Sequence, residues 1–217
     1  MIKKIELKNL IKRFNKDFNI INDVSLTFNL DKPCVVLGEE GSGKTTLLNI
    51  LCGLDLDYEG GVFIDGTERR DIKLTQRKIS YIPAEPVVFN NKSVYKNLEY
   101  AIRVNSGKKD KKKEREIIKQ LAQEYSIADL LTKKFKRCSL YNKKLVQLIR
   151  AVIKRPELIV FDEPFCGLSL YEKTTLWQRV VCDMSKLSCG VVVAENGQNN
   201  ILFNDCYIVG MSGGAIF

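Results

Sequence analysis

The spacing of apolar residues along the chain predicts a mixture of strands and helices. Residues 2–7 alternate apolar and charged side chains, which is typical of a half-exposed edge strand, and residues 22–28 predict a second strand. Shorter uninterrupted apolar runs indicate strands that are buried on both faces. These runs lie at 33–37, 158–161 and 190–194, and a further short strand is expected at 78–82.

A helical period dominates the middle of the chain, from about residue 93 to residue 150. Ser93 is a suitable N-cap for a helix over 94–102, and 105–107 should end it. Ile117, Ile118 and Leu121 recur at helical spacing within a basic helix over 108–125. Further helices are predicted at 46–52, 140–153 and 171–187, with hairpin strands at 62–66 and 206–214. The pattern as a whole predicts an α/β fold.

The most informative motif follows the buried run 33–37. It fits G-x-x-x-x-G-K-[ST], in which backbone N–H groups at a helix N-terminus cradle phosphates. The glycines let the backbone wrap closely, the lysine adds a charge over the outer phosphates, and the following threonine is placed for Mg²⁺. The alternative is a glycine-rich turn that binds nothing. The predicted nucleotide-binding residues are Gly38, Glu39, Glu40, Gly41, Ser42, Gly43, Lys44, Thr45 and Thr46.

Two carboxylates end the second buried run. Asp162 and Glu163 would point toward the crevice at the carboxyl ends of a parallel sheet, where ligands bind. Together with Thr45, Asp162 would hold Mg²⁺, and Glu163 would act catalytically by polarising the attacking water. An acidic turn without a function is the alternative, and the presence of the phosphate-binding motif disfavours it.

Composition limits the remaining choices. The chain has 217 residues, enough for one sizeable domain, and no apolar run approaches the roughly 18 residues of a membrane span. The first residues lack the apolar core of a signal peptide, so we expect a cytoplasmic protein whose membrane association comes through a partner. Seven cysteines without a C-x-x-C pair suggest reduced thiols, and the absence of histidine excludes every histidine-based catalytic or metal site.

Net charge is +9, which is compatible with an acidic partner such as nucleic acid. Much of the excess lies in one run over 108–119, where Asp110, Glu114 and Glu116 interrupt the lysines and aromatic residues are missing. This pattern favours a solvated helix face, and nucleic acid is the less favoured partner.

These motifs, their order and the helical insert between them resemble the nucleotide-binding subunit of an ABC transporter over nearly the whole chain. The resemblance implies one domain over 1–217: a P-loop NTPase (ABC-type) core, an antiparallel β-subdomain and a helical subdomain at approximately 93–150. It further implies that Phe14 stacks on adenine. It implies two cassettes, a homodimer or a heterodimer, that sandwich ATP and Mg²⁺ and drive a membrane-spanning permease subunit from the inner face of the cell membrane.

Four positions depart from the family pattern. Ala84 stands at the Q-loop glutamine, Ser139 is the one residue kept from the signature, Ser169 replaces the D-loop aspartate, and Glu195 lies near the switch histidine. At its position Glu195 would repel a phosphate and not donate to it. Losing one positioned donor typically lowers a rate by about 10²–10³. We therefore expect ATP binding with hydrolysis that is slow or dependent on a partner.

Three functions are compatible with this sequence. The chain could energise a membrane transporter, it could bind ATP as a regulatory or structural module with little turnover, or it could be a soluble ABC-type protein acting on nucleic acid. The missing donors favour the second function and the retained Glu163 favours the first.

Overall fold

The computed structural model describes residues 2–15, 18–72, 78–106, 110–197 and 202–217. Its larger sheet has the strand order β10-β9-β3-β8-β7-β6, in which β10 pairs antiparallel with β9 and the other neighbours are parallel. The strands of this sheet are β3 (Cys34–Leu37), β6 (Ile79–Ile82), β7 (Leu158–Asp162), β8 (Gly190–Glu195), β9 (Tyr207–Ser212) and β10 (Ala215–Ile216). The buried strands and the terminal hairpin predicted from the sequence are thereby confirmed.

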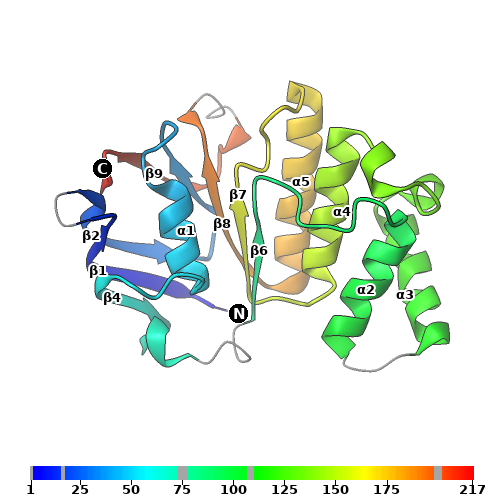
Figure 1. Ribbon diagram of the computed structural model, residues 1–217, viewed down its shortest axis with the longest axis horizontal. Coiled ribbons are helices and arrows are strands. Elements are labelled where there is room, and N and C mark those ends of the chain that lie inside the picture. The colour runs from blue at the N-terminus through cyan, green and yellow to red at the C-terminus, as the bar shows by residue number, and fades with distance from the viewer. Residues whose placement is uncertain (1, 16–17, 73–77, 107–109, 198–201) are drawn as a thin grey trace.

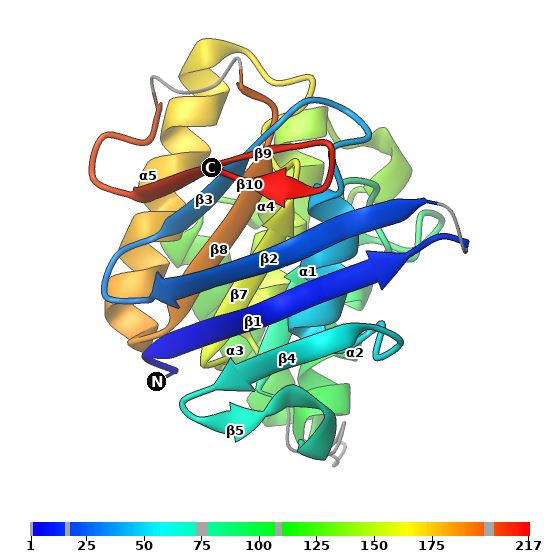
Figure 2. The same cartoon turned by 90° about the vertical axis from the view of Figure 1, so that its left-hand side faces the viewer.

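The smaller sheet is antiparallel, with the order β2-β1-β4-β5 (Figure 2). Its strands are β1 (Lys4–Arg13), β2 (Asn19–Asn29), β4 (Glu59–Ile64) and β5 (Thr67–Glu68). The prediction that the first strand lies at an edge is wrong, because β1 pairs with β2 on one side and β4 on the other. An alternating pattern indicates that one face of the sheet is exposed. It does not distinguish an edge strand from an interior strand, because both have one exposed face in such a sheet.

Helix α1 (Lys44–Cys52) lies between the two sheets (Figures 1 and 2). Within β3, Cys34 and Val36 pack in the cluster that contains α1 and the smaller sheet. The alternate residues Val35 and Leu37 pack in a second cluster with the helices on the opposite face. Burial on both faces explains why this strand is an uninterrupted apolar run.

The opposite face of the larger sheet is covered by helices, and α2 and α3 lie farthest from the smaller sheet (Figure 1). The helices are α2 (Val94–Ser106), α3 (Lys111–Glu124), α4 (Leu140–Val152) and α5 (Leu170–Leu187), with short 3₁₀ turns η1 (Arg69–Asp71), η3 (Ala128–Leu130) and η4 (Phe135–Arg137). Several helix boundaries differ from expectation: α1 begins two residues earlier, α5 begins one residue earlier, α4 ends at Val152, and α2 continues through the predicted break to Ser106. The expected start of the basic helix, at 108–109, lies outside the described residues.

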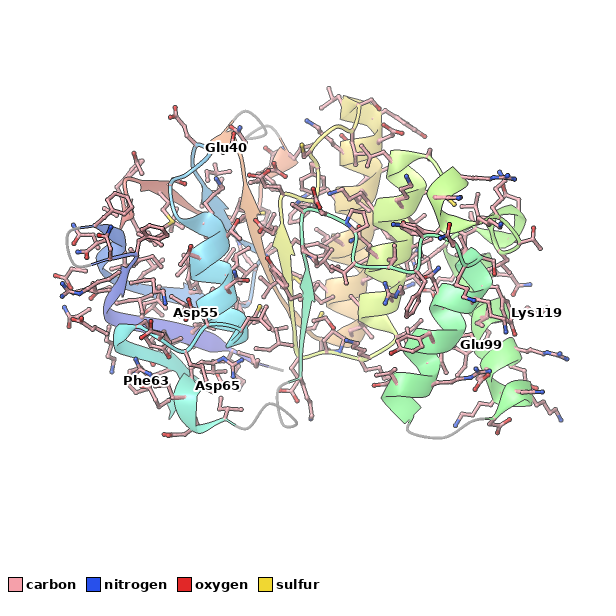
Figure 3. The ribbon with its side chains drawn as sticks, viewed as in Figure 1. Glu40, Asp55, Phe63, Asp65, Glu99 and Lys119 are labelled. Atoms are coloured by element: carbon pink, nitrogen blue, oxygen red, sulfur yellow. The ribbon has the colours of Figure 1, made fainter. Side chains whose placement is uncertain are left out.

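The basic helix α3 has the amphipathic arrangement that its spacing predicted. Ile118 is buried, whereas Lys119 is exposed on the outer side of the helix (Figure 3). On the inner side, Glu114 accepts two hydrogen bonds of 2.9 Å from the Arg103 guanidinium of α2. The lysines of α3 are therefore exposed, but Glu114 does not belong to their face, because it is buried against α2. Within the described residues, no helix combines the length and the apolar character needed to cross a bilayer.

Candidate functional site

The phosphate-binding motif forms a tight loop from the end of β3 into α1. Gly41 and Gly43 adopt positive φ values of 78° and 102°, where residues with a Cβ are disfavoured. Gly38 is needed for a different reason, because a Cβ at this position would overlap the carbonyl oxygen of Met211. The sequence motif therefore reflects both backbone conformation and the close approach of β9.

Lys44, the first residue of α1, lies inside this loop and is only 4% exposed. Its Nζ donates hydrogen bonds of 2.8 Å to the carbonyl oxygens of Gly38 and Glu39. The same Nζ lies 3.9 Å from Oε1 of Glu163. The loop thus holds a desolvated positive charge beside a carboxylate, a placement suited to an anionic ligand.

Asp162 ends β7 and contacts the first turn of α1. The Thr45 hydroxyl donates a 2.8 Å hydrogen bond to Oδ2 of Asp162, and the Tyr81 hydroxyl donates a second one of 3.1 Å. Oδ1 of Asp162 is buried and has no hydrogen-bond partner among the described residues. A buried carboxylate oxygen without a donor is a suitable ligand for a hard cation.

Tyr81 was not predicted from the sequence as part of the site. It lies on β6, which pairs parallel with β7, so its side chain reaches Asp162 across neighbouring strands. Burial, and then the charge of Asp162, raise the pKa of the Tyr81 phenol. The phenol therefore stays protonated and keeps donating to Asp162 at neutral pH.

Glu163 directly follows β7 and has a left-handed backbone with φ of 44°. Its N–H donates a 2.9 Å hydrogen bond to the carbonyl oxygen of Ala194, at the end of the neighbouring strand β8. Non-glycine residues with positive φ are uncommon and concentrate at functional sites. The side chain of Glu163 is 34% exposed, so solvent can reach its carboxylate.

Lys44, Thr45, Asp162 and Glu163 line one cavity of about 700 Å³, a volume within the range of ligand sites in proteins. Glu40 lies on its loop at the end of the sheet where β3, β7 and β8 all finish (Figure 3). Nine lining residues were predicted from the sequence, whereas Ile20, Cys166 and Asn196 were not. The full lining is Ile20, Glu40, Gly41, Gly43, Lys44, Thr45, Thr46, Ala84, Asp162, Glu163, Cys166 and Asn196.

Asn196 could have been anticipated from its position. It follows β8 directly, and the carboxyl ends of adjacent parallel strands meet at the edge where ligands bind. Its neighbour Glu195, which was expected to face a phosphate, does not line the cavity. Glu195 is 1% exposed, and its Oε2 accepts a 3.2 Å hydrogen bond from the N–H of Phe165. The expected repulsion between Glu195 and a phosphate is therefore not supported by this geometry.

Six other predicted site residues lie outside the cavity lining, namely Gly38, Glu39 and Ser42 of the loop, and Phe14, Ser139 and Ser169. Phe14 is 75% exposed near the end of the β1–β2 hairpin, where its N–H donates to the carbonyl oxygen of Phe18. Ser139 and Ser169 are the N-caps of α4 and α5. The Ser169 side chain and Glu172 form a capping box, so this serine has a structural role in starting its helix.

An open parallel sheet with a phosphate-binding loop at its carboxyl edge, and two carboxylates facing that loop, defines a P-loop nucleotide-binding protein. A family model described as "ABC transporter" matches residues 21–166, more than half of the chain. The chain therefore belongs to the ABC transporter family, whose ATP-binding cassettes energise transport, and its fold is the ABC-type P-loop NTPase fold with an antiparallel β-subdomain.

Individual relatives agree with this assignment. The lipopolysaccharide export system ATP-binding protein LptB of Haemophilus influenzae is 29% identical over 94% of this chain and 85% of its own length. Among solved structures, cbiO1 from Clostridium perfringens, part of the ABC transporter complex cbiONQ, gives a TM-score of 0.85 at 20% identity over 100% of this chain and 88% of that one.

The cassette MJ0796, a dimer bound to ADP and phosphate, gives a TM-score of 0.82 at 22% identity over 98% of this chain and 96% of that one. Likeness at this identity concerns the fold. The chain spans about half the length of several import ATP-binding proteins that it also matches.

Proposed function

We propose that this chain binds Mg-ATP in the cavity beside Lys44 and energises a separate membrane-spanning subunit by hydrolysing it. The observation that carries the proposal is the convergence of two sequence motifs at one place. Thr45 and Asp162 are joined by a 2.8 Å hydrogen bond, and Lys44 lies 3.9 Å from Glu163. A lysine, a hydroxyl and two carboxylates around a phosphate-binding loop are the groups that phosphoryl transfer requires.

Each residue has a separate part in this proposal. The N–H groups of the loop and the ammonium of Lys44 hold the phosphates, and Phe14 offers an exposed ring for stacking on the adenine. Glu163 accepts a proton from the water that attacks the γ-phosphorus, and the bond to the departing ADP oxygen breaks. Asn196 contributes an amide to the cavity wall, where it is placed to orient water or phosphate.

The donor set fits a magnesium ion. Thr45 Oγ1 and the unpartnered Oδ1 of Asp162 would hold it, directly or through water. In the described part of the chain, no three acidic or cysteine side chains converge to form a protein-only metal cage. That is the expected situation for Mg²⁺, which keeps several waters and takes phosphate oxygens as ligands. When bound, the ion would neutralise charge on the phosphates.

We further propose that residues 1–217 form a single nucleotide-binding domain, with approximately 93–150 as its helical subdomain. Its partners would be a second cassette and a membrane-spanning permease that holds it at the inner face of the membrane. Support comes from MJ0796, which is a dimeric cassette, and from cbiO1, which is part of the ABC transporter complex cbiONQ.

A second candidate function is a regulatory cassette that binds ATP but hydrolyses it slowly. One observation favours it: Ala84 lines the cavity, yet its methyl group can neither hold a water nor coordinate an ion. Asn196 and Glu163 argue for retained turnover. Measuring the hydrolysis rate of the purified complex with its membrane partner distinguishes the two functions.

The test of nucleotide binding is Lys44→Ala, with Lys119→Ala as the control because Lys119 is exposed on α3. We expect calorimetry to show no measurable Mg-ATP binding by Lys44→Ala and wild-type affinity for Lys119→Ala. Equal affinity in all three proteins would refute the assignment of the phosphate site.

The test of hydrolysis is Glu163→Gln, which keeps the side-chain shape but cannot accept the proton. We expect unchanged Mg-ATP affinity, loss of phosphate release and accumulation of an ATP-bound dimer in size-exclusion chromatography. A Glu163→Gln protein that hydrolyses ATP at the wild-type rate would remove Glu163 from its role.

A further inference from the structure

Lys144 is a buried lysine outside the phosphate-binding loop. It lies in the second turn of α4, and its side chain is 6% exposed. Burial lowers the pKa of its ammonium, although the nearby groups of Cys166, Glu195, Glu163 and Asp162 act in the opposite direction. Burying a lysine costs free energy, so the contacts of its ammonium need an explanation.

The ammonium of Lys144 joins three segments that are far apart in the sequence. Its Nζ donates a 3.0 Å hydrogen bond to the carbonyl oxygen of Ala84, which follows β6. It donates a second one, of 3.2 Å, to the carbonyl oxygen of Glu163, which follows β7. Both acceptors belong to residues that line the nucleotide cavity, whereas Lys144 does not line it.

The hydrogen bond from Lys144 to Glu163 is made to a residue with an unusual backbone conformation. Glu163 has φ of 44°, and its N–H is fixed by the carbonyl oxygen of Ala194 at 2.9 Å. Its carbonyl group accepts from Lys144 and, at 3.4 Å, from the N–H of Cys166. The direction of the Cα–Cβ bond follows from the orientation of these two peptides, so the contacts aim the Glu163 carboxylate into the cavity.

We propose that Lys144 is a positioning residue for Glu163. Its ammonium holds the backbone of this general base in the left-handed conformation and connects α4 to the cavity by hydrogen bonds. The inference rests on the proposed role of Glu163. The contact with position 84 does not depend on its side chain, because Lys144 donates to the backbone carbonyl of Ala84. The second turn of α4 is thereby hydrogen-bonded to the two cavity segments that contain Ala84 and Glu163.

The test compares Lys144→Met, which keeps the length of the side chain but removes the donors, with Lys143→Met. Lys143 is the adjacent lysine of α4 and is only half-buried. Each protein, in excess over labelled Mg-ATP, is followed through a single turnover, and its affinity for Mg-ATP and its thermal unfolding are measured separately. A misplaced catalytic group can lower a rate by about 10²-fold, so we expect a fall of roughly 10–100-fold for Lys144→Met.

The affinity for Mg-ATP should change less than about 3-fold in the same variant, because the phosphate-binding loop is untouched. Lys143→Met should behave as wild type, and Lys144→Arg, which restores the charged donors, should recover part of the rate. A purely structural role would lower the affinity and the rate together. If Lys144→Met does not fold, Lys144→Leu, which also lacks donors, replaces it, with the same expected loss of rate.

Three results would overturn the proposal. Lys144→Met could hydrolyse ATP as fast as the wild-type protein, or its loss of rate could be matched by an equal loss of affinity. The third is that the wild-type protein hydrolyses ATP no faster than Glu163→Gln. Amide exchange in the nucleotide-free protein is an independent readout. Residues 162–168 should exchange about 10-fold faster in Lys144→Met than in Lys143→Met, since one hydrogen bond to a charged donor is lost. Unchanged exchange would contradict the proposal, even if ATP binding, and with it the proposed function, had failed.

Discussion

Replacing Asp162 by asparagine should uncouple ATP binding from magnesium without unfolding the protein. Asparagine has nearly the same shape, and its carbonyl oxygen can still accept from Thr45 and Tyr81, which lie 2.8 and 3.1 Å from Oδ2. The change removes the negative charge and the buried, unpartnered oxygen that would hold the ion. The expected effect is therefore on the ligand-dependent part of the stability.

The magnitude follows from linkage. A ligand at 100 times its dissociation constant stabilises a protein by about 2.7 kcal/mol, and for a chain of this size about 1 kcal/mol shifts the melting temperature by roughly 2–4 °C. Wild type with a non-hydrolysable ATP analogue and Mg²⁺ should therefore melt roughly 5–10 °C higher than without ligand.

In the ligand-free protein, two opposing effects of the substitution nearly cancel. Each hydrogen bond to a charged acceptor, worth about 1.5–3 kcal/mol, becomes a neutral one of about 0.5–1.5 kcal/mol. Removing a buried charge offsets this loss, because a carboxylate pays a desolvation penalty of several kcal/mol. We expect the melting temperature of ligand-free Asp162→Asn to lie within roughly 4 °C of wild type.

Differential scanning fluorimetry with the analogue, in Mg²⁺ or in EDTA, provides the measurement. Asp162→Asn should show the same small shift in both buffers, whereas Glu163→Gln, the matched control, should keep the magnesium-dependent increment of wild type. The reasoning is wrong if Asp162→Asn keeps that full increment, or if wild type has none.

Two further predictions concern the periphery of the site. Phe14→Ala should weaken ATP binding by about 1–3 kcal/mol but leave the affinity for inorganic tripolyphosphate unchanged, because only ATP has a base to stack on the ring. Calorimetry measures both affinities, and equal losses for both ligands would exclude stacking. Native thiol labelling should be fast at the exposed Cys166 and Cys182 and slow at Cys34, where burial raises the pKa to about 12. Mg-ATP should protect Cys166, which lines the cavity, from labelling but should not protect Cys182. Peptide mass spectrometry measures the labelling of each cysteine, and equal protection of both would contradict this prediction.

Much of the site was predictable because its determinants are local in the sequence. The loop from Gly38 to Thr46 needs glycines for its positive φ values and its close contacts, and these needs appear as a fixed spacing. Asp162 and Glu163 were found because they end an uninterrupted apolar run. The carboxyl end of such a strand is where ligands bind in parallel sheets.

Other features of the fold and of the site depend on contacts between distant segments, which local spacing does not encode. The interior position of β1 follows from its pairing with both β2 and β4. Tyr81 contacts Asp162 because β6 pairs with β7, and Lys144 of α4 contacts the segments that follow both strands.

The sequence by itself thus determined the phosphate-binding loop, the acidic strand end and most helices, since each depends on neighbours within a few residues. Only the tertiary structure decided that Glu195 turns to the Phe165 amide and does not line the cavity. The physical reason is that a side chain's direction at a strand end depends on which donors the adjacent strands bring to it. Strand order and packing set those donors.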